Sequence, residues 1–346
     1  MSLVESAVHR LEGAPLPDFV TRAGIELLVS RTQRRLAAQP AGFEAEFARA
    51  MAGRPIAENT AEANAQHYEL PPQFFGLILG PRRKYSCCLY APGDDLATAE
   101  ARSLEKTCRH AGLHDGQTVL ELGCGWGSLS LWMAEHYPRS RIVAVSNSHA
   151  QRRFIQQAAR ERGLRNLEVV TADMNSFTPD RRFDRIVSVE MFEHMANWGA
   201  LLARVRDWLA PEGRLFVHVF THARTPYRFN VADPGDWIAR HFFAGGVMPS
   251  HGLMGRFGDL FELERDWRWD GRQYQTTALD WLANFDRARD EITEILRPVY
   301  GQETGLWLRR WRLFFLATAG LFGHDRGKVW GVSHYRLKPR VQETVR

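Results

Sequence analysis

A strand followed by three closely spaced glycines constrains the fold more than any other feature of this sequence. Residues 118–122 (TVLEL) form an apolar run typical of a buried strand, and Gly123, Gly125 and Gly127 follow within five positions. Glycines at the start of the next helix let the backbone approach a ligand closely and present free N–H groups to it. A tight turn without a ligand would not need three of them. The pattern therefore predicts a ligand-binding loop at the carboxyl end of a strand in a parallel α/β sheet.

The segments after this loop alternate between strands and helices. Apolar strands that alternate with amphipathic helices indicate a parallel sheet covered by helices on both faces. We expect one α/β domain over residues 61–346. The further strands are expected at 141–146, 167–171, 184–189, 214–220, 262–269 and 330–337. The helices of the domain are expected at 130–137, 150–162, 199–209, 278–299 and 303–322.

Residues 1–60 are expected to form a helical N-terminal extension. The segment Leu16-Pro17-Asp18 is typical of a helix start. Apolar residues then recur at helical spacing, at Phe19, Ile25, Leu28 and Val29.

The glycine loop does not match the dinucleotide-binding pattern. That pattern needs G-x-G-x-x-G and an acidic residue at the end of the second strand. Here the spacing is G-x-G-x-G, Glu121 precedes the first glycine by two residues, and the second strand ends at Ser146-Asn147. A nicotinamide or flavin dinucleotide is therefore not the expected ligand.

The pattern E-x-G-x-G-x-G instead resembles the first motif of class I S-adenosylmethionine-dependent methyltransferases. The resemblance implies a Rossmann-like, mostly parallel seven-stranded sheet with helices on both faces, and S-adenosylmethionine as the cofactor. It implies that Gly123 and Gly125 hold the methionine end of the cofactor. Ribose and adenine would then be held by later residues, namely Asn147 or Gln151, and Asp173 and Met174.

Motifs outside the loop resemble those of the cyclopropane fatty acid synthase superfamily. These motifs are NAQHYE at 64–69, KYSCC at 84–88 and SVEMFEH at 188–194. Within the superfamily, the chain resembles plant amine N-methyltransferases of the coclaurine type from about Asn64 to Lys338. The resemblance implies that Tyr85 and Ser86 belong to a cofactor lid, which His67 and Tyr68 would complete.

Two positions favour the amine branch of this superfamily. The resemblance aligns Glu190 with a glycine of the cyclopropane synthases, whereas the amine enzymes have glutamate there. Thr318 aligns with a cysteine of the lipid enzymes. Counterparts of the bicarbonate pocket of the cyclopropane synthases are present here. The amine enzymes largely share these residue types, so they do not distinguish the amine branch from the lipid branch. They are Cys87, Glu193, His218 and Tyr274.

Glu190, Glu193 and His194 follow the fourth strand and are the expected catalytic residues. An alkyl amine is mostly protonated at neutral pH, as lysine is, and its lone pair is then unavailable. A carboxylate attracts the ammonium and an imidazole or a second carboxylate accepts its proton. If the chain turns helically there, Glu190 meets Glu193 and His194, and two acids in one cleft tend to raise the pKa of one of them. We rank Glu193 and His194 before Glu190.

Each of these side chains also has a plain structural interpretation. Acids at a helix start favour the helix dipole, and a histidine is often a satisfied structural residue. His218 is as well explained by a buried, hydrogen-bonded role as by substrate contact. Aromatic residues of the later segments could stack on a substrate ring or pack in the core, namely Trp237, Phe242, Phe243 and Trp330.

Charge and cysteine content exclude other classes of function. The formal net charge is +5, and nine basic against two acidic residues fall in 308–346. Most of these basic residues lie in predicted folded elements, so a nucleic-acid-binding arm is not expected. The four cysteines lack metal-ligand spacing, and we expect no metal. No signal peptide or membrane span is visible, so we expect a cytoplasmic protein without stable membrane insertion.

The leading interpretation is an S-adenosylmethionine-dependent N-methyltransferase acting on a small aromatic or alkaloid-like, benzylisoquinoline-type amine. One alternative is a cyclopropane synthase-like enzyme that modifies unsaturated acyl chains of phospholipids. The other is a non-catalytic S-adenosylmethionine-binding protein. The expected partner is a small-molecule amine, and a homodimer is left open.

Overall fold

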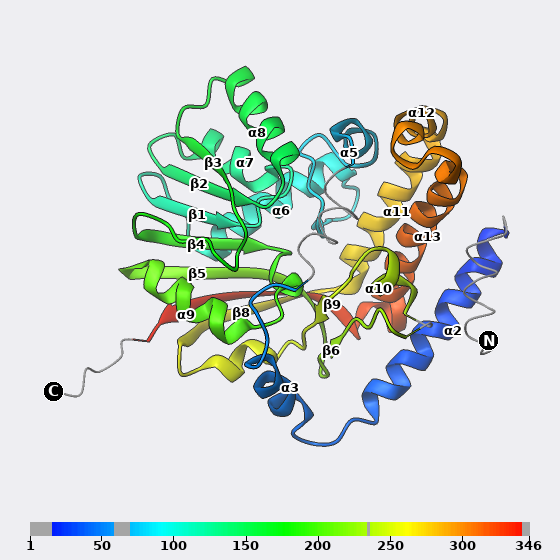
Figure 1. The fold of residues 1–346 in the computed structure, drawn as a ribbon, viewed down its shortest axis with the longest axis horizontal. Coiled ribbons are helices and arrows are strands. Elements are labelled where there is room, and N and C mark those ends of the chain that lie inside the picture. The colour runs from blue at the N-terminus through cyan, green and yellow to red at the C-terminus, as the bar shows by residue number, and fades with distance from the viewer. Residues whose placement is uncertain (1–15, 59–69, 234–235, 341–346) are drawn as a thin grey trace.

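The computed structural model describes residues 16–58, 70–233 and 236–340. Its centre is a seven-stranded sheet with the order β3-β2-β1-β4-β5-β9-β8 (Figure 1). The pairs among β1 to β5 are parallel, and β9 runs antiparallel to β5 and β8. The predicted mostly parallel α/β class is confirmed. The strands of this sheet are β1 (Thr118–Leu122), β2 (Arg141–Ser146), β3 (Leu167–Thr171), β4 (Phe183–Val189), β5 (Leu209–His222), β8 (Phe261–Asp270) and β9 (Trp330–Pro339).

Most helices of the domain begin within two residues of their predicted positions. The predicted helix at 278–299 is wrong, because two helices meet at Ala288. The first of them begins already at Gly271, where the Asp270 side chain caps it by accepting a hydrogen bond from the N–H of Arg272. The helices are α2 (Asp18–Ala37), α3 (Phe43–Met51), α5 (Pro72–Ile78), α6 (Leu96–Ala111), α7 (Ser128–His136), α8 (His149–Glu161), α9 (Trp198–Trp208), α10 (Trp237–His241), α11 (Gly271–Arg287), α12 (Arg289–Tyr300) and α13 (Thr304–Gly323).

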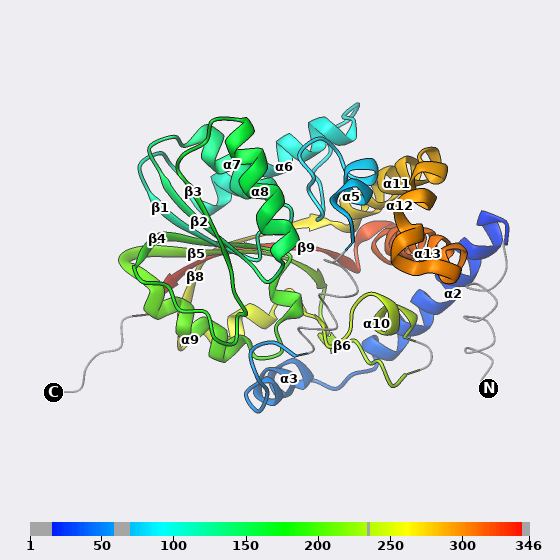
Figure 2. The same ribbon diagram turned by 45° about the horizontal axis from the view of Figure 1, so that its top comes forward.

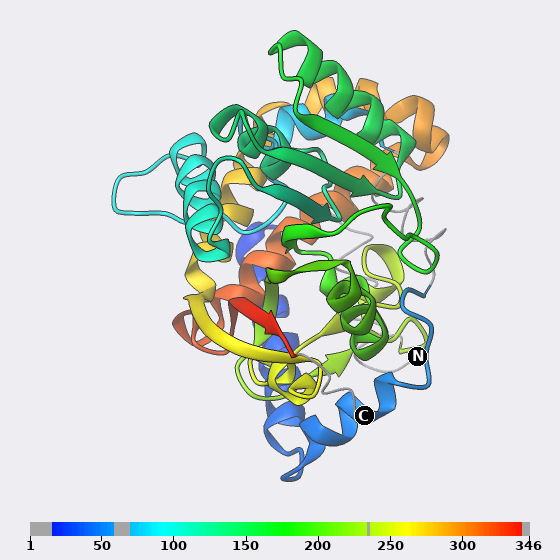
Figure 3. The ribbon, with the colours of Figure 1, turned by 90° about the vertical axis from the view of Figure 1, so that its left-hand side faces the viewer.

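Helices cover both faces of the sheet. Successive side chains of a strand point to opposite faces, so a continuously apolar strand needs cover on both. In β1, Val119 packs with residues of α6 and α7, whereas Leu120 and Leu122 pack with residues of α9. Figure 2 shows α7 and α8 on one side of the sheet and α9 on the other, and Figure 3 shows the twist of the strands.

The N-terminal helix α2 lies against α13, on the right of Figure 1. Arg312 of α13 bonds the carboxylate of Asp18, which stands at the predicted helix start, with an Nη1–Oδ1 distance of 2.6 Å. Ile25 and Val29 are buried, as predicted, but Phe19 is 75% exposed. The predicted apolar stripe is therefore wrong at Phe19, which lies on the outer side of the helix.

The basic residues near the C-terminus are spread over folded elements. Arg309, Arg310 and Arg312 belong to α13, and Arg336 and Lys338 belong to β9. Arg312 pairs with two carboxylates, those of Asp18 and Asp286. In the part of the chain that the structure describes, none of the helices has the length and apolar character needed to cross a bilayer.

The sheet has a topological switch between β1 and β4. The chain leaves β1 toward β2 and β3, then returns to pair β4 with the other side of β1. Open α/β sheets bind ligands at such a point, beyond the carboxyl ends of the strands. The glycine loop after β1 and residues 190–194 after β4 both lie there, so the fold itself brings the predicted binding loop beside the predicted catalytic residues.

Candidate active site

The first cavity of the site lies at the carboxyl edge of the sheet. It is lined by the loop after β1, the end of β2, the start of α8 and the segment after β3. All eight residues that the sequence predicts for cofactor binding line this one cavity: Tyr85, Ser86, Gly123, Gly125, Asn147, Gln151, Asp173 and Met174. The motif residues 64–69, including His67 and Tyr68, lie outside the described residues.

The cavity walls fit a ligand with hydrogen-bonding groups. Gly123 and Gly125 have φ of +76° and +51°, a conformation that favours glycine, and an added Cβ at Gly125 would meet nothing within 4 Å. Backbone at Gly125 is therefore open to a ligand. Nε2 of Gln151 and Oγ of Ser128 are buried without a hydrogen-bond partner among the described residues. Such buried groups are normally satisfied, so both suit a bound polar molecule.

Glu121 of β1 is a buried acid in the same wall. Ser130 of α7 donates a hydrogen bond to its carboxylate. Burial raises the pKa of Glu121 to about 8, and the Ser130 hydrogen bond opposes that shift. The folded protein therefore holds a proton on Glu121 at neutral pH that the unfolded chain releases.

Because of this proton, the stability of the folded protein decreases as pH rises. The folded pKa is raised, so the folded state binds more protons than the unfolded state between about pH 4.5 and about 8. Unfolding free energy then falls as pH rises through that window. We expect Glu121→Gln, which mimics the protonated acid, to flatten this slope and to raise Tm at pH 8 more than at pH 5. Thermal melts across the window measure this, and an unchanged slope in the variant would refute it.

A second, mostly aromatic cavity adjoins the first. Tyr85, Glu190 and His194 line both, so they stand where the two spaces meet. Of the four aromatic residues left open between substrate contact and core packing, Phe243 lines this cavity. The other three, Trp237, Phe242 and Trp330, pack in the core. Most of its apolar wall carries no sequence motif and was not predicted. It includes Phe220, Phe229, Ile238, Met248, Trp281, Phe314, Leu321 and Phe322, and Thr318 and Tyr274 also line the cavity.

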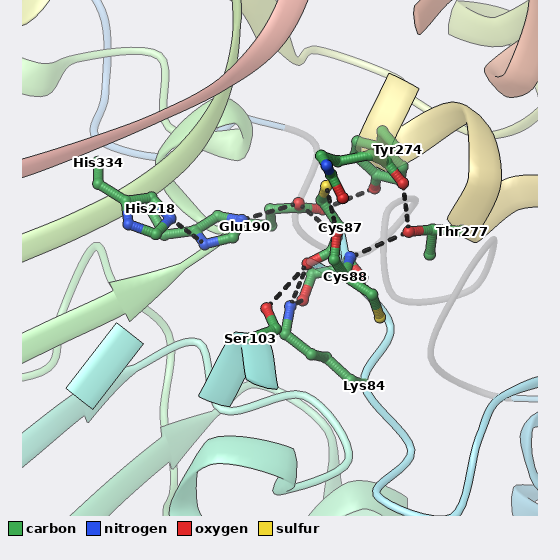
Figure 4. Close-up of polar contacts among 11 residues, drawn as sticks. Lys84, Cys87, Cys88, Ser103, Glu190, His218, Tyr274, Thr277 and His334 are labelled. Carbon is green, nitrogen blue, oxygen red and sulfur yellow. Dashed lines mark hydrogen bonds and ion pairs between the residues drawn. The ribbon is translucent and has the colours of Figure 1, made fainter. Parts of the chain in front are cut away.

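Glu190 is held by three groups at the junction (Figure 4). Its carboxylate accepts hydrogen bonds from the Cys87 N–H (2.9 Å) and the Tyr274 hydroxyl (2.7 Å). Nε2 of His218 lies 3.2 Å from the same carboxylate. Three of the four predicted counterparts of a bicarbonate pocket thus surround the Glu190 carboxylate, and the fourth, Glu193, is not among these partners.

The backbone at Glu190 departs from the helical turn expected there. Its φ is +47°, and the following short 3₁₀ helix, η1 (Phe192–His194), begins only two residues later. The expectation of a regular helical spacing from Glu190 to His194 is therefore wrong. A residue other than glycine in this region costs about 1–3 kcal/mol, so contacts around the carboxylate must stabilise the turn.

Glu193 is the buried carboxylate that faces the second cavity. It has no exposed surface, and neither oxygen has a hydrogen-bond partner among the described residues. Burial, and then the charge of Glu190, raise its pKa well above the ordinary value. The backbone N–H groups of Glu193 and Phe220 lie near enough to oppose the shift, although neither has the geometry of a hydrogen bond to the carboxylate. An unpaired buried acid lowers stability unless a ligand partners it. His194, which follows it, packs its ring 4.4 Å from that of Phe243.

Lys84 is a buried cation behind the junction. Its ammonium donates to the carbonyl of Cys87 at 2.6 Å and to the Ser86 hydroxyl. Burial raises the pKa of Glu190, and the Lys84 charge opposes that shift most strongly. Cys87 and Cys88 are buried, and burial raises the pKa of each thiol, which agrees with the expected packing role.

Comparisons with known proteins agree with this geometry. The family model for mycolic acid cyclopropane synthetase matches residues 57–332. An (S)-coclaurine N-methyltransferase from Thalictrum flavum subsp. glaucum is 34% identical over 291 residues, 82% of this chain and 81% of the plant protein. The cyclopropane-fatty-acyl-phospholipid synthase of Escherichia coli (strain K12) is 33% identical over 269 residues, 77% of this chain and 66% of the bacterial protein.

Two solved structures align over most of the chain. Coclaurine N-methyltransferase bound to N-methylheliamine and S-adenosylhomocysteine superposes with a TM-score of 0.93 and 29% identity, covering 97% of this chain and 100% of that chain. The cyclopropane synthase MmaA2 of Mycobacterium tuberculosis superposes with a TM-score of 0.69 and 25% identity, covering 82% and 99%.

The glycine cavity at the switch point, together with these relatives, defines an S-adenosylmethionine-dependent methyltransferase of class I fold. Within that class, the chain belongs to the mycolic acid cyclopropane synthetase family.

Proposed function

We propose that the protein transfers a methyl group to the nitrogen of a small amine with an aromatic, benzylisoquinoline-type body. The observation that carries this proposal is the unpaired, fully buried carboxylate of Glu193 in an aromatic cavity beside the cofactor cavity. A cationic nitrogen is the natural partner of a buried acid, and aromatic walls suit both a ring and a cation.

The relatives support the same substrate class. Sequence identity alone does not distinguish an amine substrate from a lipid substrate, since the amine and lipid enzymes are 34% and 33% identical to this chain. The superposition favours the amine enzyme, with a TM-score of 0.93 against 0.69. Glu190 adds support, because its carboxylate occupies the junction and brings a second acid to the place where an amine would enter.

In this proposal the protein prepares the nucleophile. S-adenosylmethionine, when bound along Gly123, Gln151 and the other residues of the first cavity, supplies a methyl group activated by a positive sulfur. Glu193 and Glu190 attract the ammonium form of the amine. Either carboxylate, Glu190 or Glu193 assisted by His194, accepts its proton, which frees the lone pair. The aromatic walls exclude water and orient the nitrogen toward the junction at Tyr85.

A binding measurement tests the recognition step. Tetrahydroisoquinoline and its neutral oxygen counterpart, isochroman, have the same shape, and calorimetry gives their affinities for the protein saturated with S-adenosylhomocysteine. We expect the amine to bind at least about tenfold more tightly, a difference of about 1.4 kcal/mol. Glu193→Gln should remove most of this preference. Equal affinities in the wild-type protein would overturn the assignment of the cavity to an amine.

Glu190→Gly tests the role of the junction carboxylate. The change removes a carboxylate and leaves the Cys87 N–H, the Tyr274 hydroxyl and His218 around a gap of carboxylate size. We expect amine methylation to fall about 10²-fold, because a proton acceptor is lost. Added formate should restore part of the rate by filling the gap. Glu190→Gln is the control, because its amide fills the gap and formate should then have no effect.

Formate that fails to stimulate Glu190→Gly, in a variant that still binds S-adenosylhomocysteine, would contradict this role. The result would mean that the glutamate side chain acts by position alone and not as a carboxylate.

A further inference from the structure

A chain of three histidines begins at the Glu190 carboxylate and leads away from the active site. Nε2 of His218 lies 3.2 Å from Oε1 of Glu190. Nδ1 of His218 lies 2.9 Å from Nε2 of His334, and Nδ1 of His334 lies 2.9 Å from Nδ1 of His110. Figure 4 shows the first two imidazoles in line with Glu190. Each inner histidine therefore uses both ring nitrogens to connect its neighbours.

The sheet and one helix produce this alignment. His218 of β5 and His334 of β9 are direct partners in the antiparallel ladder, so their side chains share a face of the sheet. That face also carries Phe216, which packs with α6 residues. His110 stands in the last turn of α6 and stacks on Trp267 of β8, with ring centroids 3.8 Å apart. Trp267 is in turn the ladder partner of His334.

Burial of the three histidines decreases from the active site outward. His218 and His334 have no exposed surface, whereas His110 is half-buried at the far end. Burial lowers the pKa of all three imidazoles, to about 4 for His110. Nearby cations on three elements lower the pKa of His110 further. They are Lys106 and Arg109 of α6, Arg265 of β8 and Arg336 of β9. The charge of Lys84 also lowers the pKa of His218 and of His334. All three rings are therefore neutral at physiological pH and do not retain a proton.

We propose that His218, His334 and His110 form a proton relay that carries the proton of the amine substrate from Glu190 to solvent. The inference rests on the proposed amine methylation, since that reaction leaves one proton in a buried site at each turnover. Glu193 has no hydrogen-bonded path out among the described residues. Glu190 has one, and the two acids are close enough that the charge of Glu190 raises the pKa of Glu193.

The transfer balances at every atom. Protonated Glu190 gives its hydrogen to Nε2 of His218, and Nδ1 of His218 gives its own to Nε2 of His334. Nδ1 of His334 then gives its hydrogen to Nδ1 of His110, and Nε2 of His110 releases one to water. Glu190 regains its negative charge and the imidazoles stay neutral. Each ring ends in the other tautomer. The starting tautomers return when the hydrogens shift back along the three rings after product release, and Glu190 then passes its proton to water in the emptied cavity.

Two substitutions of His110 separate a relay from a structural network. His110→Phe keeps an aromatic ring on Trp267 but has no nitrogen, so it blocks the exit. His110→Ala opens a space that a small buffer molecule such as imidazole can enter. The matched control is His136→Phe, because His136 also stacks on a tryptophan, Trp132, at 4.0 Å, on α7 and away from the relay.

We expect His110→Phe to lower kcat for the amine about tenfold with KM and S-adenosylhomocysteine affinity unchanged, since general acid–base steps contribute at least this much. His110→Ala should be slow in dilute non-coordinating buffer and recover as imidazole is added, whereas His110→Phe should not recover. His136→Phe should match the wild-type protein. Turnover of His110→Phe within twofold of wild type, or a loss in His110→Ala that imidazole does not restore, would overturn the relay.

A second readout needs no turnover. In protein free of cofactor and amine, NMR measures how fast the ring N–H of fully buried His334 exchanges with water. The relay predicts exchange that His110→Phe slows about tenfold and His136→Phe leaves unchanged. Slowed exchange in a protein that methylates no amine would overturn the proposed function and support the relay. Unslowed exchange in a protein that does methylate amines would overturn the relay alone.

Discussion

Glu193→Gln should lower kcat for amine methylation about 10²- to 10³-fold, because it removes a proton acceptor that no other side chain at that position replaces. The amide keeps the size of the side chain. The affinity for S-adenosylhomocysteine should stay within about twofold of wild type, since Glu193 lines the second cavity and not the first. Glu212→Gln, on an exposed residue, is the control and should change neither quantity.

The pH dependence of kcat gives the same variant a second signature. The pKa of Glu193 is raised by burial and by Glu190, so the group carries a proton at low pH and gains its charge only as pH rises. Only the charged form accepts the amine proton, so activity should increase with pH through that raised pKa. The increase should be absent in Glu193→Gln. Wild-type turnover and pH profile in the variant would remove Glu193 from the mechanism.

Gly123→Ala should weaken cofactor binding about 10²-fold and lower the stability of the protein. An added Cβ would lie 2.5 Å from Cγ of Met191, and the φ of +76° already disfavours a side chain. Met191 follows Glu190 directly, so a displaced Met191 disturbs the loop after β4 as well. A clash and backbone strain of this kind together amount to about 3 kcal/mol or more, which corresponds to about a hundredfold in affinity.

Gly116→Ala separates the clash from the backbone strain. Gly116 also has a positive φ, of +94°, but an added Cβ there would meet nothing within 4 Å, and it does not line the cofactor cavity. We expect this variant to lose about 1 kcal/mol of stability and to bind S-adenosylhomocysteine normally. Fluorescence titration and thermal melts measure both effects. Equal behaviour of the two variants would mean that contact with Met191 does not matter.

The regular part of the fold was readable from the sequence because it follows from local patterns. The predicted strands at 118–122, 141–146 and 167–171 match β1, β2 and β3 residue for residue. Each is a short, mostly apolar run bounded by turn or loop residues, and in each the hydrophobic pattern and the strand propensity of the residues agree. The glycine loop was found from its local pattern, and the other residues of the cofactor cavity were implied by the resemblance to methyltransferases. They lie together because parallel strands place their carboxyl ends on one edge.

The geometry around Glu190 was not readable in the same way. A φ of +47° at a glutamate goes against local preference and exists only because Cys87, Tyr274 and His218, from distant segments, hold the carboxylate. The pairing of His218 with His334 depends on strand register across more than a hundred residues. The facing of aromatic side chains depends on helix packing, so the sequence left open which of Trp237, Phe242, Phe243 and Trp330 would reach a substrate, and only Phe243 lines the second cavity.

The measurement that tests the central claim most directly is the destination of a labelled methyl group. The protein is incubated with methyl-labelled S-adenosylmethionine in one vessel with a panel of benzylisoquinoline-type amines and unsaturated phospholipid vesicles, and mass spectrometry locates the label. We predict label on an amine nitrogen and none in the acyl chains. Label in the phospholipid and in no amine would contradict the account and identify a lipid enzyme.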